Sequence, residues 1–481
     1  MFMGIDVGSS GCKVSVIGAD GTTLAFAKRE YSFLYENGRC ELDAEGVWGC
    51  VLACLGELGE TIDLSHLQTI SVTSFGEVFV LLDGDKRVLR KAISYEDGRG
   101  KEELAAIEAD LYAITGASPD VMFALPKLMW VKKHEPALFD KVAHVCMFAD
   151  FILFKLGSRH HTDYSLAART LMLDVKNKRW SDEILSSAGI DKTILGELVP
   201  SGAPVGYIDE KIAEKTKLPP RVLLLAGGHD QPCAALGAGI IKSGIALDGM
   251  GSNECIVPAF SSPMINDVMK RSHLVCVPHI VPETYVTYAF NRTAGSLFRW
   301  YEALLGGEGY DTLLDAMPDG PTDLFVLPHF AGAATPYMDD AATGAVVGLK
   351  LSTTKGELTR AIIEGLSFEM LVNISCLKDA GFEIEKLYAS GGMSKSDRVL
   401  QVKADVLGIP VTRLANAETG TVGTAILGAL ATGVYKTFDE AVDALVKTEK
   451  TFVPDLEKHK IYKEKFTKYE KMYHSVKEML Q

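Results

Sequence analysis

Two short Gly/Ser turns, far apart in the chain, each follow an apolar strand that carries an aspartate. The first turn is Gly8-Ser9-Ser10, after the strand with Asp6, and the second is Gly251-Ser252, after the strand with Asp248. The backbone N–H groups and hydroxyls of such a turn can surround an anion. Two of them in one chain predict two related lobes that hold one polyphosphate, and therefore a nucleotide-dependent enzyme.

The residues beside the first turn have two interpretations each. Asp6 ends a buried strand, where a carboxylate suits a Mg²⁺ ion brought by the nucleotide, directly or through water. It could equally cap backbone amides of the turn. Lys13 could contact phosphate, although a solvated strand face explains it at least as well. The turn joins strand to strand, which separates it from the Walker and Rossmann turns that join strand to helix.

Asp230 is the candidate for acid–base chemistry. It follows an apolar strand at 221–226 and the pair Gly227-Gly228, and a helix is expected to begin near Gln231. Open α/β sheets bind ligands at the carboxyl ends of their strands, and an aspartate there can take the proton of an attacking hydroxyl. The alternative is an ordinary helix N-cap.

A second Gly/Ser-rich segment, 391–396, lies between a strand and a helix. Backbone N–H groups at that helix start could face a nucleotide. A plain strand-to-helix connection is equally compatible with the local sequence.

Alternating strands and helices are expected to position these residues. Strands are expected at 12–18, 22–28, 69–74, 78–83, 385–390 and 409–414. Helices are expected at 43–58, 353–378, 396–407 and 418–433, over most of 100–200, and from Asp455 onward. The alternation predicts a largely parallel sheet in each lobe, and the meander of strands at the start makes the sheets mixed.

The length predicts two domains. A chain of 481 residues exceeds one ordinary core, and an Ala/Gly-rich stretch ends at Ser243. We therefore place an N-terminal domain at 1–243 and a C-terminal domain at 244–481.

The composition excludes several classes of function. A net charge of −14 argues against nucleic-acid binding, which depends on Lys and Arg. No apolar run is long enough for a membrane span, and the N-terminus lacks the pattern of a signal peptide. The nine scattered cysteines predict neither a disulfide framework nor a zinc site. We expect a reduced, cytoplasmic protein.

Together, these segments resemble the FGGY family of carbohydrate kinases, within the actin/hexokinase/Hsp70-like superfamily. The resemblance covers nearly the whole chain and follows the order of the family. It is carried by 4–10 (GIDVGSS), 93–99 (ISYEDGR), 126–130 (PKLMW), 227–231 (GGHDQ), 251–252 (GS), 294–296 (AGS), 335–339 (TPYMD), 391–396 (GGMSKS), and Gln401 with Ala404-Asp405.

The resemblance implies an α/β fold of two ribonuclease-H-like lobes with mixed sheets around a central cleft. The sugar would lie mainly against the first lobe and ATP mainly against the second. Asp230 would be the catalytic base, and Asp6 and Asp230 would hold Mg²⁺. The residues implied at the nucleotide are Gly8, Ser9, Ser10, Lys13, Gly251, Ser252, Gly295, Gly391, Gly392 and Ser396. The implied sugar contacts are Phe75, Gly76, Glu77, Asp97 and Gln231.

Two departures concern the substrate. Phe75-Gly76-Glu77 stands where xylulokinase-like members usually carry a Gln-Met-His segment, and its Phe-Gly pair is closer to fuculokinase and rhamnulokinase. Thr343 stands where many members carry Arg. We expect ATP-dependent phosphorylation of a ketose of the xylulose or deoxyketohexose type. The alternative substrate is a sugar acid or polyol such as gluconate, glycerol or erythritol. The rival class is a nucleotide-driven switch or filament protein, and a homodimer is compatible with the sequence.

Overall fold

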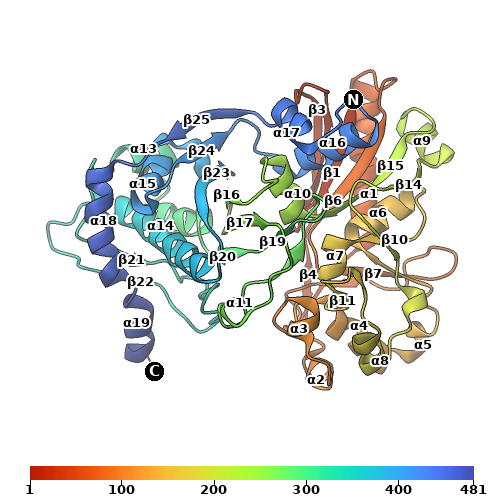
Figure 1. The fold of residues 1–481 in the computed structure, drawn as a ribbon, viewed down its shortest axis with the longest axis horizontal. Coiled ribbons are helices and arrows are strands. Elements are labelled where there is room, and N and C mark those ends of the chain that lie inside the picture. The colour runs from red at the N-terminus through yellow and green to blue at the C-terminus, as the bar shows by residue number, and fades with distance from the viewer. Residues whose placement is uncertain (481) are drawn as a thin grey trace.

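Two mixed sheets form the centres of two lobes in the computed structural model, which describes residues 1–480 (Figure 1). The first sheet has the strand order β14-β15-β6-β1-β2-β3. Its strands are β1 (Phe2–Val7), β2 (Gly11–Ile17), β3 (Thr23–Glu30), β6 (Thr69–Ser74), β14 (Pro204–Tyr207) and β15 (Leu223–His229). The opening β1-β2-β3 meander is antiparallel, whereas β1, β6 and β15 run parallel, so the predicted mixed sheet is confirmed.

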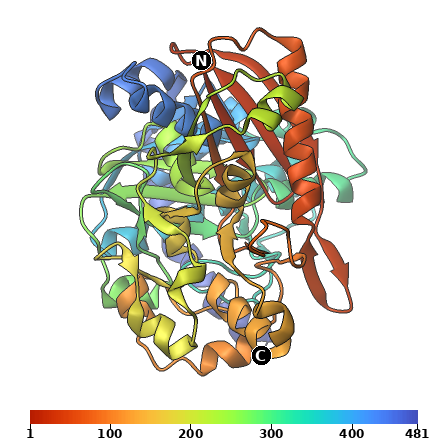
Figure 2. The ribbon, with the colours of Figure 1, turned by 90° about the vertical axis from the view of Figure 1, so that its right-hand side faces the viewer.

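Helices cover both faces of the first sheet. The long helix α1 (Ala44–Thr61) lies along β2 and β3, as Figure 2 shows, and buries Val47, Val51 and Leu55 against them. On the same face, α6 (Phe148–Leu156) packs on β6 and β15, and the N–H of Ala149 donates to Oγ of Ser74; α7 (Tyr164–Ala168) lies beside β15. The opposite face, on the side of Gly4 and Thr73, is covered by α16 (Thr419–Ala431). Asp43 stands at the expected N-cap position of α1, although its side chain makes no capping hydrogen bond.

The region 100–200 was expected to be mainly helical, and this prediction is only partly correct. Its further helices are α2 (Lys101–Ala105), α3 (Leu111–Thr115), α4 (Ala124–His134), α5 (Pro136–Phe139) and α8 (Asp182–Ala188), and α9 (Glu210–Thr216) follows. Its strands are β9 (His144–Met147), β10 (His161–Asp163), β11 (Leu173–Asp174), β12 (Arg179–Trp180) and β13 (Glu197–Val199). Strands of two to four residues are too short to leave an alternating pattern in the sequence.

Small sheets complete the first lobe. β4 (Leu34–Glu36), β5 (Arg39–Leu42) and β8 (Ala92–Ile93) form one, and β7 (Phe79–Leu82) pairs with β9. These pieces lie around the carboxyl ends of the central parallel strands, and they enclose the aromatic side chains Phe33, Phe75 and Tyr95.

The second sheet has the order β18-β19-β17-β16-β23-β24-β25, with β20 paired to β17. Its strands are β16 (Gly244–Met250), β17 (Glu254–Phe260), β18 (Val277–Pro278), β19 (Tyr285–Val286), β20 (Ala289–Asn291), β23 (Ile384–Ser390), β24 (Val411–Leu414) and β25 (Thr448–Phe452). β16, β23 and β24 are parallel, and the β16-β17 hairpin repeats the β1-β2 hairpin of the first lobe.

The helices around the second sheet agree with the expected segments. They include α14 (Lys355–Asp379), α15 (Asp397–Leu407), α18 (Leu456–Tyr469) and α19 (Met472–Leu480). Shorter elements are α11 (Asp267–Arg271), α12 (Gly295–Leu304), α13 (Tyr310–Asp315), and the hairpin of β21 (Phe325–Leu327) and β22 (Ala345–Val347). No helix within residues 1–480 is long and apolar enough to cross a membrane.

One helix of the C-terminal half packs on the first lobe. α16 (Thr419–Ala431) packs on β1 and β6 of the first sheet and against α10 (Asp230–Gly237), and α17 (Phe438–Leu445) packs on α16 (Figure 1). The chain therefore crosses between the lobes at α10 and again at α16. This pair of helices places Asp230 and the start of α16 at the junction of the two lobes.

Candidate active site

Three parallel strands of the first sheet end side by side. Val7 of β1 is paired with Ser74 of β6, and Ser74 is paired with His229 of β15. The residues that follow, which include Gly8 and Asp230, therefore begin from one edge of the sheet. This is where open α/β sheets bind their ligands.

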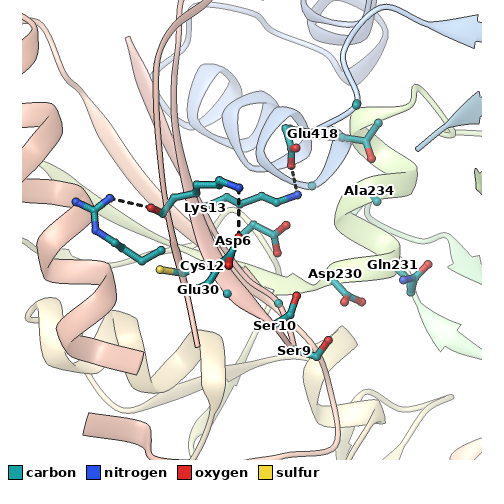
Figure 3. A pocket seen from close by; sticks show the side chains of 17 residues that line it. Asp6, Ser9, Ser10, Cys12, Lys13, Glu30, Asp230, Gln231, Ala234 and Glu418 are labelled. Carbon is teal, nitrogen blue, oxygen red and sulfur yellow. Dashed lines mark hydrogen bonds and ion pairs between the residues drawn. The ribbon is translucent and has the colours of Figure 1, made fainter. Parts of the chain in front are cut away.

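A cavity of about 400 Å³ opens at this edge. Figure 3 shows Asp6, Ser9, Ser10 and Asp230 around one space, with Glu418 across from them. The lining includes Asp6, Gly8, Ser9, Ser10, Lys13, Asp230 and Gln231 from the first half of the chain, and Glu418, Thr419 and Gly420 from the start of α16. The structure thus brings together the predicted residues of the first phosphate turn, the predicted base and its neighbour Gln231.

Asp6 and Asp230 both face this cavity, and the pKa of each carboxyl group is raised. Burial raises the pKa of Asp6 to about 6, while Lys13 opposes the shift and Glu418 adds to it. Burial raises the pKa of Asp230 to about 8, and the charges of Asp6 and Glu77 add to that shift. Such a carboxyl, in a cleft and beside like charges, has the properties of a general base or a cation ligand.

The backbone before Asp230 is fixed by contacts that the strand itself does not provide. The pairing of β15 with β6 shifts register just before Gly228, and this bulge turns the chain toward the cavity. Thr73 donates from Oγ1 to the Gly228 carbonyl at 2.9 Å, and the N–H of His229 donates to Oγ of Ser165 at 2.8 Å. His229 is the N-cap residue of α10, so Asp230 is its first helical residue and its carboxylate does not serve as the cap.

The side chain of His229 links the base to the second lobe. Its Nε2 lies 3.1 Å from Oδ1 of Asp230, and its Nδ1 lies 3.1 Å from the hydroxyl of Tyr288. Burial, together with the charge of Arg169, lowers the pKa of His229 well below its usual value, so the ring is neutral. A neutral ring satisfies both neighbours when Tyr288 donates to Nδ1 and Nε2–H donates to Asp230.

The predicted sugar contacts fall into two groups. Glu77 lies beside Asp230 and receives a hydrogen bond of 2.6 Å from Nε of Arg169, and Phe75 packs on the Phe148 ring behind it. Asp97 instead lies away from the cavity: Arg99 and the N–H of Cys40 occupy both of its oxygens, and its side chain is 1% exposed. A direct contact between Asp97 and a substrate stays a prediction, since both of its carboxylate oxygens already have protein partners.

The predicted nucleotide segments of the second lobe meet one another. The N–H of Gly295 donates to the Gly251 carbonyl at 3.0 Å, and the N–H of Ala294 donates to the Ser252 carbonyl at 2.9 Å. Gly391 has φ +95° and lies so close to Met250 that an added Cβ would be 2.6 Å from its carbonyl oxygen. One edge of the second sheet therefore gathers Gly251, Ser252, Gly295 and Gly391, which the sequence places far apart.

A second cavity, of about 440 Å³, lies against this edge. Its lining includes Phe298, Tyr310, Leu314, Gly392, Met393 and Ser396. Ser396 is the N-cap of α15, and its hydroxyl accepts from the Val399 N–H at 3.4 Å. The lining also includes charged residues, which are Asp311, Asp315, Lys395, Asp397 and Arg398. A cavity that combines apolar side chains with polar groups beside a helix start suits the flat base of a nucleotide, because the polar groups can orient it.

A buried ion cluster fixes the β16-β17 hairpin that carries Gly251 and Ser252. Lys403 of α15 donates to Oδ2 of Asp248 at 2.6 Å and also contacts Glu254, and all three side chains are at most 2% exposed. Asp248 and Glu254 lie on the two strands of the hairpin. The ammonium group of Lys403 therefore holds β16 and β17 together next to the turn at Gly251 and Ser252.

Four contributors to the site were not predicted from the sequence. The start of α16, at Glu418-Thr419-Gly420, had a detectable signal, because a helix N-terminus attracts anions and a helix was expected from 418. Arg169, His229 and Tyr288 had no comparable signal. Their importance depends on which other side chains they touch, and these lie far away in sequence.

Comparisons with known proteins agree with this geometry. Residues 1–237 match the model of the N-terminal domain, and 250–432 the model of the C-terminal domain, of the FGGY family of carbohydrate kinases. A protein described as xylulose kinase from Bacillus subtilis is 30% identical and is covered over 97% of its length by 99% of this chain. Among solved structures, that of a xyloylose kinase from Brucella ovis has a TM-score of 0.91 at 26% identity, with 99% of both chains covered. A gluconate kinase from Lactobacillus acidophilus shares the fold, with a TM-score of 0.90 at 23% identity over 99% of this chain and 98% of that one.

Proposed function

The chain belongs to the FGGY family of carbohydrate kinases, and we propose that the hydroxyl it phosphorylates with ATP belongs to a neutral ketose of the xylulose type. The observation that carries this proposal is the position of Asp230, which lies at the sheet edge between the phosphate turn and Glu77. The similarity to a xylulose kinase over nearly the whole chain supports the choice of ketose.

In this proposal Asp230 is the catalytic base. It accepts the proton of the sugar hydroxyl as that oxygen attacks the γ-phosphorus. The neutral His229 ring orients the carboxylate through its contact of 3.1 Å with Oδ1. Sequence neighbours Ser9 and Ser10 offer donors for phosphate oxygens from the first lobe, and Gly251 and Ser252 offer them from the second.

The residues present also fit a Mg²⁺ ion. Asp6 and Asp230 supply hard oxygen ligands to one cavity, and the charge of Asp6 raises the pKa of Asp230, a repulsion that a cation would relieve. Within residues 1–480 no cluster of three or more His, Cys, Asp or Glu side chains could hold a metal alone, so phosphate and water would complete the ligand set. When bound, the ion would neutralise charge on the phosphate oxygens.

The nucleotide and the sugar occupy different lobes in this account. The cavity of about 440 Å³ takes the adenosine, with Gly392 and Ser396 in its lining, and the cavity of about 400 Å³ takes the phosphates. The division of the chain at 243/244 is part of the proposal, although α16 of the C-terminal half packs on the first sheet. Closure of the lobes would exclude water from the phosphoryl group.

A coupled ADP-release assay across ketopentoses, deoxyketohexoses, aldonic acids and polyols tests the proposal. A ketopentose is expected to give the highest kcat/KM, with release in its absence slower by a factor of about 100 or more. A highest value for an aldonic acid or polyol would replace the ketose. A sugar-independent ATPase that polymerises or binds peptides would support the rival class instead.

A further inference from the structure

An ion pair that was not predicted from the sequence stands beside the proposed base. Arg169, just after α7, donates from Nε to Oε1 of Glu77 at 2.6 Å, and its Nη2 contacts the same oxygen. Both side chains are more than nine-tenths buried, at 7% and 8% exposure. Both contacts end on Oε1, which leaves Oε2 of Glu77 outside the pair.

The guanidinium group has one further donor without a partner. Nη1 of Arg169 is buried and has no hydrogen-bond partner among the residues that the structure describes. The group lies over the Phe123 ring, 4.7 Å from its centre, and 5.7 Å from the centre of the Tyr288 ring. A buried guanidinium N–H left unpaired is costly, so the position favours a ligand oxygen as its acceptor.

Because Gly76 has no side chain, Arg169 can lie next to His229 and the proposed base Asp230. A Cβ atom at Gly76 would lie 2.6 Å from Cγ of Arg169 and 3.1 Å from Cδ2 of His229, the residue that contacts Asp230. Any side chain at position 76 would therefore displace Arg169. The next residue, Glu77, has the left-handed φ of +60°.

The charges of the side chains around Asp230 disfavour an anionic substrate. Glu77 neutralises Arg169, and Asp230 and Asp6 add carboxylates nearby. The other buried cation close to Glu77 is Lys127, and it already donates to the carbonyl of Asp97 at 3.0 Å. A carboxylate of a sugar acid would meet no cation here that lacks a counter-charge. A neutral sugar needs only one donor, such as Nη1 of Arg169, and one acceptor, such as Oε2 of Glu77.

We propose that Arg169 and Glu77 form the specificity-determining contact of the site, with Nη1 donating to an oxygen of a neutral sugar and Oε2 accepting from one of its hydroxyls. This inference rests on the proposed function and deepens it. It assigns substrate binding to Arg169, and it predicts that sugar acids are poor substrates because the ion pair is already neutral.

The test compares Arg169→Lys, which keeps the charge but lacks Nη1, and the neutral double variant Glu77→Gln/Arg169→Met, with the unaltered enzyme. Each is assayed with a ketopentose, its singly deoxygenated analogues and the matching aldonic acid. Both variants should lose about 30-fold or more in kcat/KM for the ketopentose, with the KM for ATP within about twofold. One deoxygenated analogue should react poorly with the unaltered enzyme yet suffer no further loss in Arg169→Lys.

A third variant tests the charge argument. Glu77→Gln leaves Arg169 without its counter-charge, so the ratio of kcat/KM for the aldonic acid to that for the ketopentose should rise about tenfold. Arg159→Lys, at a surface pair with Glu197 in the same lobe, is the matched control and should change nothing.

The outcomes separate the inference from the proposed function. Folded Arg169→Lys with ketopentose kcat/KM within threefold of the unaltered value overturns the role of Arg169 and leaves the ketose proposal standing. An unaltered enzyme that prefers the aldonic acid overturns both the inference and the choice of a ketose, but not kinase activity. Absence of ADP release with every carbohydrate overturns both.

Discussion

Lys13 and Glu418 form an ion pair of 2.7 Å across 405 residues of sequence. Lys13 lies on β2 of the first sheet, and Glu418 precedes the first residue of α16. The pair borders the cavity that also contains Asp6 and the first phosphate turn (Figure 3). In the proposed nucleotide complex, a phosphate oxygen would replace the Glu418 carboxylate as the partner of Lys13.

Replacement of Lys13 should therefore weaken nucleotide binding. Lys13→Met removes one charge-assisted contact to phosphate, and we expect the KM for ATP to rise about tenfold. Steady-state kinetics at saturating sugar measure the change. Lys217→Met, at an exposed pair with Glu60, is the control. An unchanged KM for ATP in Lys13→Met would show that Lys13 lies only on a solvated strand face.

Two adjacent glycines should respond differently to the same substitution. Gly391→Ala places a Cβ 2.6 Å from the Met250 carbonyl at φ +95°, so the free energy of unfolding should fall by about 1–3 kcal/mol. Gly392 has helical backbone angles and open space around it, so Gly392→Ala should be nearly neutral. Chemical denaturation of both variants measures the difference, and equal effects would contradict the account of the turn.

Removing only the cation from the buried cluster of Lys403, Asp248 and Glu254 should lower the free energy of unfolding. Lys403→Met leaves Asp248 and Glu254 buried without their cation, and we expect a loss of about 3–5 kcal/mol in the free energy of unfolding. Adding Asp248→Asn and Glu254→Gln should restore most of it, because no buried charge then remains. A Lys403→Met variant as stable as the unaltered protein would show that the cluster does not hold the hairpin.

The stability of the protein should depend on pH through Asp230. Its folded pKa is about 8, whereas the unfolded carboxyl titrates near 3.8. Because the folded pKa is the higher one, the protonated carboxyl contributes stability that is full below pH 3.8 and is lost as the pH rises to about 8. Asp230→Asn stays neutral, so its advantage should grow across this window to about 1–2 kcal/mol at pH 9.

Thermal unfolding from pH 4 to pH 9, without nucleotide or divalent cation, measures that advantage. A difference in Tm that stays constant with pH would contradict the raised pKa. Asp209→Asn, at an exposed helix cap in the same lobe, supplies the comparison for a carboxylate that lies outside the cavity.

The sequence allowed the elements and the loops of the site to be predicted, because local signals specify both. The hairpins after Asp6 and Asp248, the helices over 353–378 and 396–407, and the position of Asp230 after a buried strand all have their signals within a few residues. The family resemblance then supplied roles for Gly251, Gly295 and Gly391, which the fold brings into contact.

The ion pair of Arg169 with Glu77 and the contact of Tyr288 with His229 could not be predicted in the same way. Arg169 reaches Glu77 from a segment 92 residues away, and Tyr288 reaches His229 from the other half of the chain. No local pattern encodes such pairs, because they depend on how the short strands and helices of 100–200 fold around the sheet edge. Asp97 was assigned to the substrate from its motif, but its geometry is that of an internal anchor for Arg99.

Sugar-dependent ADP release by Asp230→Asn is the most direct test of the central claim that Asp230 is the base. The substitution keeps the shape of the side chain and removes its ability to accept a proton, so we expect unchanged ATP binding and a fall in kcat of about 1,000-fold. ATP binding is measured by titration calorimetry on the same sample. A folded Asp230→Asn enzyme that retains kcat within tenfold of the unaltered value would contradict the account.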